Sequence, residues 1–282
     1  MKIPLLGGHV SVAGGLYKAG EAAADMGAKA IQIFGASPRQ WRANLPTPEN
    51  IERYKKAIDE AGVESVYLHG AYLVNLASEG EIFEKSVKNL TTHFEIANII
   101  GADGLIFHIG SDKGGDRDRA LNQIASGMRK VLGAVKEGKS KLIVENASGG
   151  KGKIGTTIEE IAGLLDKVDS SRVACCLDTA HVFEAGVLDF SDAEVKKFFD
   201  TWDEKIGMDK LLVLHINDSK TSFGSGVDRH ENLGKGEIGL EGFRALAKET
   251  RLKDTSWILE VPGFTGEGPD KKNLDILKGV FE

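Results

Sequence analysis

The 282-residue sequence has only two cysteines and no apolar run long enough to span a membrane. Cys175 and Cys176 are neighbours in a strand-like pattern, so their side chains should point to opposite faces and are poorly placed to bond to each other. We interpret both thiols as structural groups and not as metal ligands. The apolar stretch within the opening residues MKIPLLGGHVS is too short for a secretory signal. These absences predict a cytoplasmic protein with no membrane partner.

Positive charge is also scarce. The chain has 36 lysines and arginines against 42 acidic residues, which gives a formal net charge of -6. Contacts to phosphate need positive charge, so this balance argues against a nucleic-acid partner unless bound cations supply it. The basic stretches ERYKKA and DKKN lie in helical patterns beside acidic residues, and we interpret them as solvated helix faces.

No stretch rich in proline or serine divides the chain, and 41% of its residues are hydrophobic. A chain of this length can therefore bury a large core as one domain over residues 1–282. Apolar positions at helical spacing predict helices over 48–62, 81–101, 118–138 and 157–168. Extended patterns predict eight strands, at 5–11, 30–34, 64–70, 104–109, 141–146, 173–179, 211–217 and 257–261. The alternation predicts the α/β class and a (β/α)8 TIM barrel.

Histidines and carboxylates follow the ends of these predicted strands. Catalytic groups of (β/α)8 barrels sit at the C-terminal ends of the strands, and closure of the barrel brings these ends around one cavity. Imidazole nitrogen and carboxylate oxygen are ligands for zinc and similar divalent ions, and carboxylates clustered without cations would be costly to bury. We predict a metal centre at the mouth of the barrel, with ligands drawn from His69, His108, Glu145, Asp178, His181, His215, Asp228, His230 and Glu260.

Three further features are not assigned to the metal. His93 lies in a helical pattern and is interpreted as structural. His9 ends the first predicted strand and fits equally well as a ligand or as a hydrogen-bonding residue beside the ligands. The segment GGKGKIG at 149–155 lacks the Lys-Ser/Thr pair of a phosphate-binding loop, so we predict a flexible turn there.

Four segments resemble signature motifs of the endonuclease IV family of abasic-site DNA endonucleases. They are ENASGG, CLDTAHVFEAG, LHINDSKTSFGSGVDRHENLGKGEIG and RQWRA, and the similarity runs in register from GGHVSVAGG to ILEVPG. The resemblance implies a (β/α)8 barrel that holds three zinc ions, with Mn²⁺ as an alternative metal. It also implies incision of duplex DNA 5′ to abasic sites, which leaves a 3′-hydroxyl and a 5′-deoxyribose phosphate. Three divalent ions would offset the formal charge of -6.

The resemblance also implies a role for each candidate ligand. His69, His108 and Glu145 match the ligands of the first zinc ion. Glu145 would be the catalytic residue that bridges to a second ion, whose other matching ligands are Asp178, His215 and Glu260. The matching ligands of the third ion are His181, Asp228 and His230.

Damaged double-stranded DNA with abasic sites is the partner that the family implies, and we expect a monomer. Family loops enter the minor groove and fill the gap left by the missing base, and the matching residues here are Arg39, Gln40, Tyr72 and Leu73. Trp41, in the same segment, is interpreted as packing this loop against the barrel rim.

The chain departs from the family pattern at Ile109, where proline is usual, and at Gly70. Neither change removes a ligand, so any effect would come through loop stiffness or hydrogen bonds around the ligands. A metal-dependent sugar isomerase or epimerase is the alternative on the same architecture, since such barrels also place Glu, Asp and His at strand ends around one or two ions. A metal-dependent DNA-binding or scaffold protein is a third interpretation, and it predicts that no bond is cut.

Overall fold

The strands form a closed parallel barrel, seen in a computed structural model that describes residues 2–282. Neighbouring strands follow the order β1-β10-β7-β6-β5-β4-β3-β2. They are β1 (Leu5–His9), β2 (Ala30–Phe34), β3 (Ser65–His69), β4 (Gly104–His108), β5 (Lys141–Glu145), β6 (Val173–Asp178), β7 (Leu211–Ile216) and β10 (Ser256–Leu259). The predicted TIM barrel, built as a single domain, is confirmed.

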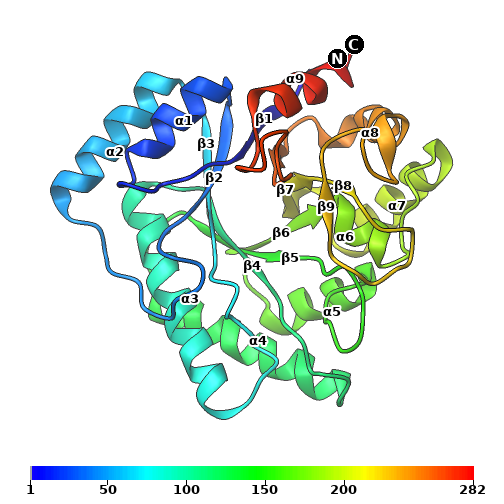
Figure 1. The fold of residues 1–282 in the computed structure, drawn as a ribbon. Helices are drawn as coiled ribbons and strands as arrows, with labels where there is room; N and C mark the ends of the chain where they lie inside the picture. Colours follow the sequence, from blue (N-terminus) through cyan, green and yellow to red (C-terminus); the bar gives the residue numbers. More distant parts are fainter. Residues whose placement is uncertain (1) are drawn as a thin grey trace.

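Helices surround the barrel on its outside (Figure 1). They are α1 (Lys18–Met26), α2 (Pro48–Ala61), α3 (Gly80–Ile100), α4 (Arg117–Ala134), α5 (Ile158–Val168), α6 (Thr179–Glu184), α7 (Asp192–Lys205), α8 (Gly239–Ala247) and α9 (Lys271–Gly279), with short 3-10 helices η1 (Met208–Lys210) and η2 (Thr250–Leu252). The four predicted helices are present. The prediction over 118–138 ran too far, because Val135 leaves helical geometry with φ -112° and ψ 81°. Among the helices described, none has both the length and the apolar character needed to cross a membrane.

Apolar side chains fill the barrel as well as the space between barrel and helices. The interior layer consists of Ala30, Tyr67, Ile106, Ile143, Ala174, Cys176, Val213 and Ile258. Cys176 belongs to this layer, whereas Cys175 packs in the outer core, so the two thiols point to opposite faces as predicted. Both are buried and free.

Strand alternation places the polar layer directly above this apolar one. A residue two positions after an inward-facing strand residue also points inward. The pairs that follow this rule are Ala30 with Gln32, Tyr67 with His69, Ile106 with His108, Ile143 with Glu145, Cys176 with Asp178, Val213 with His215 and Ile258 with Glu260. The C-terminal end of the barrel is therefore lined by seven polar side chains in one layer.

Asp218 holds the long loop that follows β7 against the barrel. Its side chain is fully buried, and its two carboxylate oxygens accept four backbone N–H groups from 234–239 at 2.9 to 3.2 Å. A short antiparallel pair, β8 (Asp218–Ser219) with β9 (His230–Glu231), closes the same loop. These contacts bring Asp228 and His230 back to the mouth of the barrel.

We expect the Asp218→Asn substitution to destabilise the fold by about 2 to 3 kcal/mol. The amide keeps only one acceptor oxygen, so at least one buried backbone N–H loses its partner, at about 1–3 kcal/mol for each such group. Chemical denaturation of the purified protein would measure the change. Asp275→Asn is the control, because Asp275 forms an exposed pair with Lys271 that contributes less than about 1 kcal/mol. Equal stability of the two variants would contradict the anchoring role of Asp218.

Candidate metal centre

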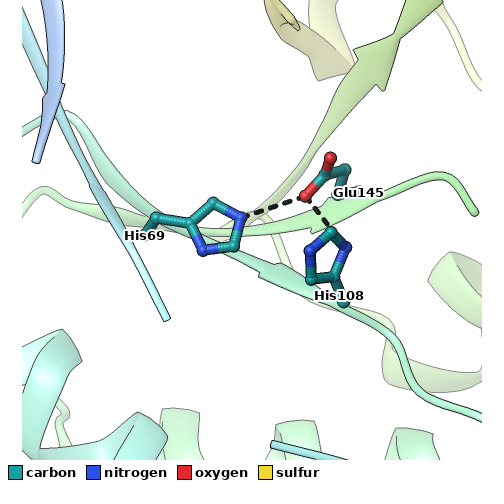
Figure 2. A group of neighbouring side chains, drawn as sticks. All are labelled: His69, His108 and Glu145. Atoms are coloured by element: carbon teal, nitrogen blue, oxygen red, sulfur yellow. Dashed lines mark hydrogen bonds and ion pairs between the residues drawn. The ribbon is translucent and has the colours of Figure 1, made fainter. Parts of the chain in front are cut away.

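Glu145 lies at the centre of the polar layer and is completely buried. Its Oε2 is 3.1 Å from His69 Nε2 and 3.2 Å from His108 Nδ1, and Figure 2 shows both imidazoles turned toward this one oxygen. Its Oε1 faces the other way and lies 3.1 Å from His215 Nδ1. Burial alone would raise the pKa of Glu145, but the nearby His108 and His215 and hydrogen bonds from His215 and His69 hold the pKa well below its usual range. Glu145 is thus a carboxylate that faces two groups of donors at once.

A second group of donors forms around His215. Glu260 Oε2 lies 3.2 Å from His215 Nδ1, and Asp178 Oδ2 lies 3.8 Å from the same nitrogen. With Glu145, these residues offer four donor atoms that all lie within 4.8 Å of one another. Within residues 2–282, no lysine or arginine forms an ion pair with any of the three carboxylates. The group has the composition of a divalent metal site.

A third group contains Asp178, His181 and His230. Asp228 also contacts both histidines, with Oδ2 at 3.2 Å from His181 Nε2 and Oδ1 at 3.6 Å from His230 Nε2. The family pattern assigns Asp178 to the second group alone. In the structure Asp178 lies between the second and third groups, because its Oδ2 is 3.6 Å from His230 Nε2.

Outer hydrogen bonds orient the imidazole rings of the first and third groups. His69 Nδ1 donates to the Gly70 carbonyl at 2.8 Å, and His181 Nδ1 donates to the Asn146 carbonyl at 2.9 Å. A carbonyl oxygen only accepts hydrogen bonds, so each ring carries its proton on the outer nitrogen. The inner Nε2 is then the nitrogen that gives up its proton when a metal binds, which leaves the tautomer that a metal ligand requires.

Gln32 orients the imidazole ring of His215 through a hydrogen bond. The sequence interpretation did not identify Gln32. Its Oε1 accepts a hydrogen bond from His215 Nε2 at 2.7 Å, which turns Nδ1 toward Glu145 and Glu260 on the inner side. Its amide nitrogen donates to Glu260 Oε1 at 2.5 Å and contacts His9 Nδ1 at 2.8 Å. Gln32 is fully buried. The signal that could have found it is strand alternation, since it lies two residues after the interior residue Ala30.

The residues present fit a group of divalent cations. Among residues 2–282, His230 Nε2 is buried without a hydrogen-bond partner, although it faces Asp178 and Asp228. Without metal the carboxylates depend on protonated imidazoles: burial would lower the pKa of His181, yet Asp178, Asp228 and Glu145 raise it to about 10. A cation that replaces such protons would bind to donors that are already oriented.

The other two histidines lie outside the three groups. His9 Nδ1 is within 2.8 Å of Gln32 Nε2 and 3.4 Å of Glu260 Oε1, so it touches the hydrogen-bond network around the second group. His93 is buried in α3 and donates from Nδ1 to the Asn89 carbonyl at 2.9 Å. The structural interpretation of His93 is confirmed.

The two departures from the family pattern lie beside the site. The Gly70 contact to His69 uses a backbone carbonyl, so it does not depend on the side chain at position 70. Ile109 is buried, and a Cβ added at Gly155 would lie 2.4 Å from its Cδ1. Any effect of the two departures on the site stays a prediction.

The four residues expected to contact DNA are exposed at the mouth: Arg39, Gln40, Tyr72 and Leu73. Tyr72 stands beside the first group, 60% exposed, with its ring stacked on His108 at a centroid distance of 6.4 Å. Its N–H donates to the Pro38 carbonyl at 3.0 Å, which joins the loops after β2 and β3. Trp41 is half-buried in the first of these loops, and its carbonyl accepts from Asn89 Nδ2 at 2.9 Å.

Two cavities open at the metal-ligand candidates. The larger, about 990 Å³, is lined by His69, His108, His181 and Tyr72 and extends toward the loop after β10. The smaller, about 400 Å³, shares His108, His181 and Tyr72 and extends toward the loops after β4 and β5. The centre is therefore open to a ligand much larger than water.

Comparisons with known proteins agree with this geometry. A family model described as a xylose isomerase-like TIM barrel matches residues 21–279. The chain is 37% identical over 276 residues to a probable endonuclease 4 from Halothermothrix orenii, which covers 97% of this chain and 99% of the relative. It is 34% identical over 281 residues to a probable endonuclease 4 from Thermosipho africanus, with 98% of each chain covered.

Solved structures show the same relationship. Endonuclease IV from Thermus thermophilus superposes with a TM-score of 0.87 at 35% identity over 98% of each chain. A D-tagatose 3-epimerase-like protein superposes with a TM-score of 0.72 at 18% identity, over 98% of this chain and 96% of that one. The second likeness shows a common fold and nothing further.

We expect Gln32→Ala to weaken metal retention by about 10- to 100-fold, the usual effect of losing a partner that orients a ligand. Both His215 Nε2 and Glu260 Oε1 would lose their contact to the amide. The rate of metal loss to a chelator would measure the effect. Tyr67→Phe is the matched control, since it removes a buried hydrogen bond to Ser256 in the barrel interior without touching the three groups. Equal retention by both variants would show that Gln32 does not position the ligands.

Metal binding should release protons near neutral pH. In the metal-free protein the pKa of His181 is raised from 6.5 to about 10, so protonation of this ring stabilises the folded state. The contribution to the free energy of unfolding is complete below pH 6.5 and is lost as the pH rises through about 10. A metal at pH 7.5 must displace that proton. Calorimetric titration of chelator-treated protein with zinc in buffers of different ionisation enthalpy would count the protons. His181→Gln should release about one fewer; heats that do not depend on the buffer would contradict the expectation.

Proposed function

The chain belongs to the endonuclease IV family, and we propose that it is a zinc-dependent DNA repair endonuclease. In this proposal it hydrolyses the phosphodiester bond 5′ to abasic sites in duplex DNA and leaves 3′-hydroxyl and 5′-deoxyribose phosphate ends. The observation that carries the proposal is the set of three donor groups around one mouth, two of which share the buried Glu145.

Nine residues of the chain would hold three zinc ions. The first ion would be held by His69, His108 and Glu145, the second by Glu145, Asp178, His215 and Glu260, and the third by His181, Asp228 and His230. The opposite orientation of the two Glu145 oxygens supports a bridging role, because each oxygen already faces a different group of imidazoles. A bridging carboxylate also offsets part of the repulsion between two neighbouring cations.

The bound ions would act as Lewis acids on the phosphate and supply a water nucleophile at neutral pH. The chain itself would orient the ligands through Gln32 and the carbonyls of Gly70 and Asn146. Tyr72 would contribute a neutral hydroxyl, because the ordinary pKa of a tyrosine, about 10, lies well above neutral pH. A protonated phenol can donate a hydrogen bond to a phosphate oxygen without adding negative charge.

The exposed residues at the mouth supply the contacts needed to find the lesion. An enzyme that acts on a nucleotide inside a duplex must turn it out of the helix. Side chains inserted between bases commonly compensate for the stacking that is lost. Tyr72 and Leu73 are exposed apolar side chains beside the donor groups, and Arg39 and Gln40 lie in the neighbouring loop. We propose these four as the DNA contacts.

A sugar isomerase or epimerase fits the same barrel but not the whole site. Such enzymes commonly use one or two ions. The third donor group and the exposed Tyr72 have no evident use in binding a small sugar. These features favour the nuclease over the epimerase.

The test combines metal analysis with cleavage of duplex DNA that carries one abasic analogue. We expect close to three zinc ions per chain in the wild type, and incision at the analogue. Glu145→Gln should slow single-turnover incision by about a thousandfold, roughly 4 kcal/mol of transition-state stabilisation. Glu249→Gln is the control, because Glu249 is a largely buried glutamate that pairs with Arg251 outside the three groups.

Each part of the proposal has its own contrary result. A wild type loaded with metal that never incises the duplex would contradict the nuclease. One reproducible ion per chain in active enzyme would rule out three zinc sites. Incision by Glu145→Gln within about tenfold of the wild type, with metals in place, would mean that Glu145 does not bridge.

A further inference from the structure

The segment 149–155, GGKGKIG, has no role in the site described so far. The sequence suggested a flexible turn, but in the structure the segment is held along the loop that follows β4. Asp112 N–H donates to the Gly152 carbonyl at 2.9 Å, and Ile154 N–H donates to the Gly110 carbonyl at 3.0 Å. An isolated antiparallel bridge joins Ser111 to Lys153. The two loops therefore form one ridge at the mouth of the barrel.

Glycines allow the backbones in this ridge to approach closely. Gly152 has φ 78°, and a Cβ there would lie 2.4 Å from the Gly114 nitrogen. Gly150 has φ 83°, and a Cβ there would lie 2.9 Å from the Gly226 carbonyl oxygen. No other residue type fits these positions without strain. The segment is thus packed between the loop after β4 and the loop that carries Asp228.

Lys153 projects from this segment toward the metal-ligand candidates. Its Nζ lies 2.5 Å from Ser148 Oγ and 3.8 Å from Asp228 Oδ2. Its side chain is only 36% exposed, whereas Ser148 is fully buried. The hydrogen bond to Ser148 holds the ammonium group beside the third donor group.

Lys113 lies on the facing loop and lines the same cavity of about 400 Å³ as Lys153. In the part of the chain that the structure describes, Lys113 forms no ion pair. The cavity also contains Tyr72, His108 and His181, so it runs from the donor groups outward to two ammonium groups. One wall is thus built from candidate metal ligands, and another carries positive charge.

This arrangement suits a phosphate group. A chain with a formal net charge of -6 must concentrate positive charge locally to bind a polyanion. Lysine binds phosphate as a point charge with three donors. A DNA strand that places one phosphate at the metal centre would carry its neighbouring phosphates past the rim of the mouth. The ridge lies on that rim.

We propose that Lys153, assisted by Lys113, binds a backbone phosphate of the DNA strand next to the phosphate that is cleaved. This inference rests on the proposed function, since it takes duplex DNA as the ligand. It assigns the ridge formed by 110–114 and 149–155 as part of the DNA-binding surface, in addition to the loops that carry Arg39 and Tyr72.

The experiment compares Lys153→Gln and Lys113→Gln in the zinc-loaded enzyme with Lys151→Gln. Lys151 is the matched control, because it lies in the same segment but is exposed and does not line the cavity. Fluorescence anisotropy would measure binding of the nicked product duplex over a series of salt concentrations. Steady-state cleavage of the abasic duplex would give kcat and KM.

We expect Lys153→Gln to weaken product binding about tenfold, as for loss of a charged hydrogen bond at a half-exposed site. The slope of log affinity against log salt concentration should become shallower by about 0.9, the value for one phosphate contact. KM should rise more than kcat falls, because the contact exists before and during the reaction. Lys113→Gln should show a smaller slope change and a smaller loss, about threefold, because Lys153 still contacts the same phosphate. Lys153→Arg should restore the slope.

The contrary results are distinct from failure of the nuclease proposal. An unchanged affinity and salt slope in Lys153→Gln, with the wild type still incising, would overturn the phosphate site alone. Equal effects of Lys151→Gln and Lys153→Gln would also overturn it, since they would reflect the general charge of the segment. A wild type that never incises abasic duplex would overturn the proposed function instead. Thermal unfolding of each variant would check that the fold is intact.

Discussion

Glu145, Asp178 and Glu260 converge at the C-terminal end of the barrel without an ion pair to any lysine or arginine among residues 2–282. Burying carboxylates in this way is costly unless positive charge lies close by. Within that described range, imidazoles are the only partners of these carboxylates that can carry a positive charge, and Asp178, Asp228 and Glu145 raise the pKa of His181 to about 10. The requirement for compensating positive charge links the barrel, the donor groups and the proposed zinc ions.

Side-chain amides of asparagine form hydrogen bonds that orient the carboxylates of this layer. Asn217 donates to Asp178 Oδ2 at 2.7 Å, and its own Oδ1 accepts from the Glu260 N–H at 2.9 Å. Asn146 accepts from the Asp178 N–H at 2.6 Å and orients His181 through its carbonyl. Such groups fix the direction of each donor without adding charge that would compete for the cation. The site is therefore oriented by the fold before any metal binds.

Positively charged side chains near the mouth of the barrel are few, and contacts with other loops fix their positions. A chain with a formal net charge of -6 repels DNA overall, so under the proposed function affinity would come from the metal centre and from a few cations near it. Lys153 is placed by a hydrogen bond to the buried Ser148 and by glycines that let its loop approach two others. Tyr72 is placed by the Pro38 carbonyl. Contact with a large substrate thus depends on loops tied to one another and to the barrel.

The sequence by itself determined the eight strands and the register of their inward-facing residues. His69, Glu145 and His215 were predictable because strand alternation and apolar periodicity are local properties of the chain. Tertiary structure alone decided which donor atoms meet: Asp178 lies between two groups, and Gln32 touches His215 across 183 residues of sequence. It also decided that 149–155 is a ridge and not a free turn, since its partners are the loops after β4 and β7. Contacts between segments distant in sequence arise only when the barrel closes, so no local pattern records them.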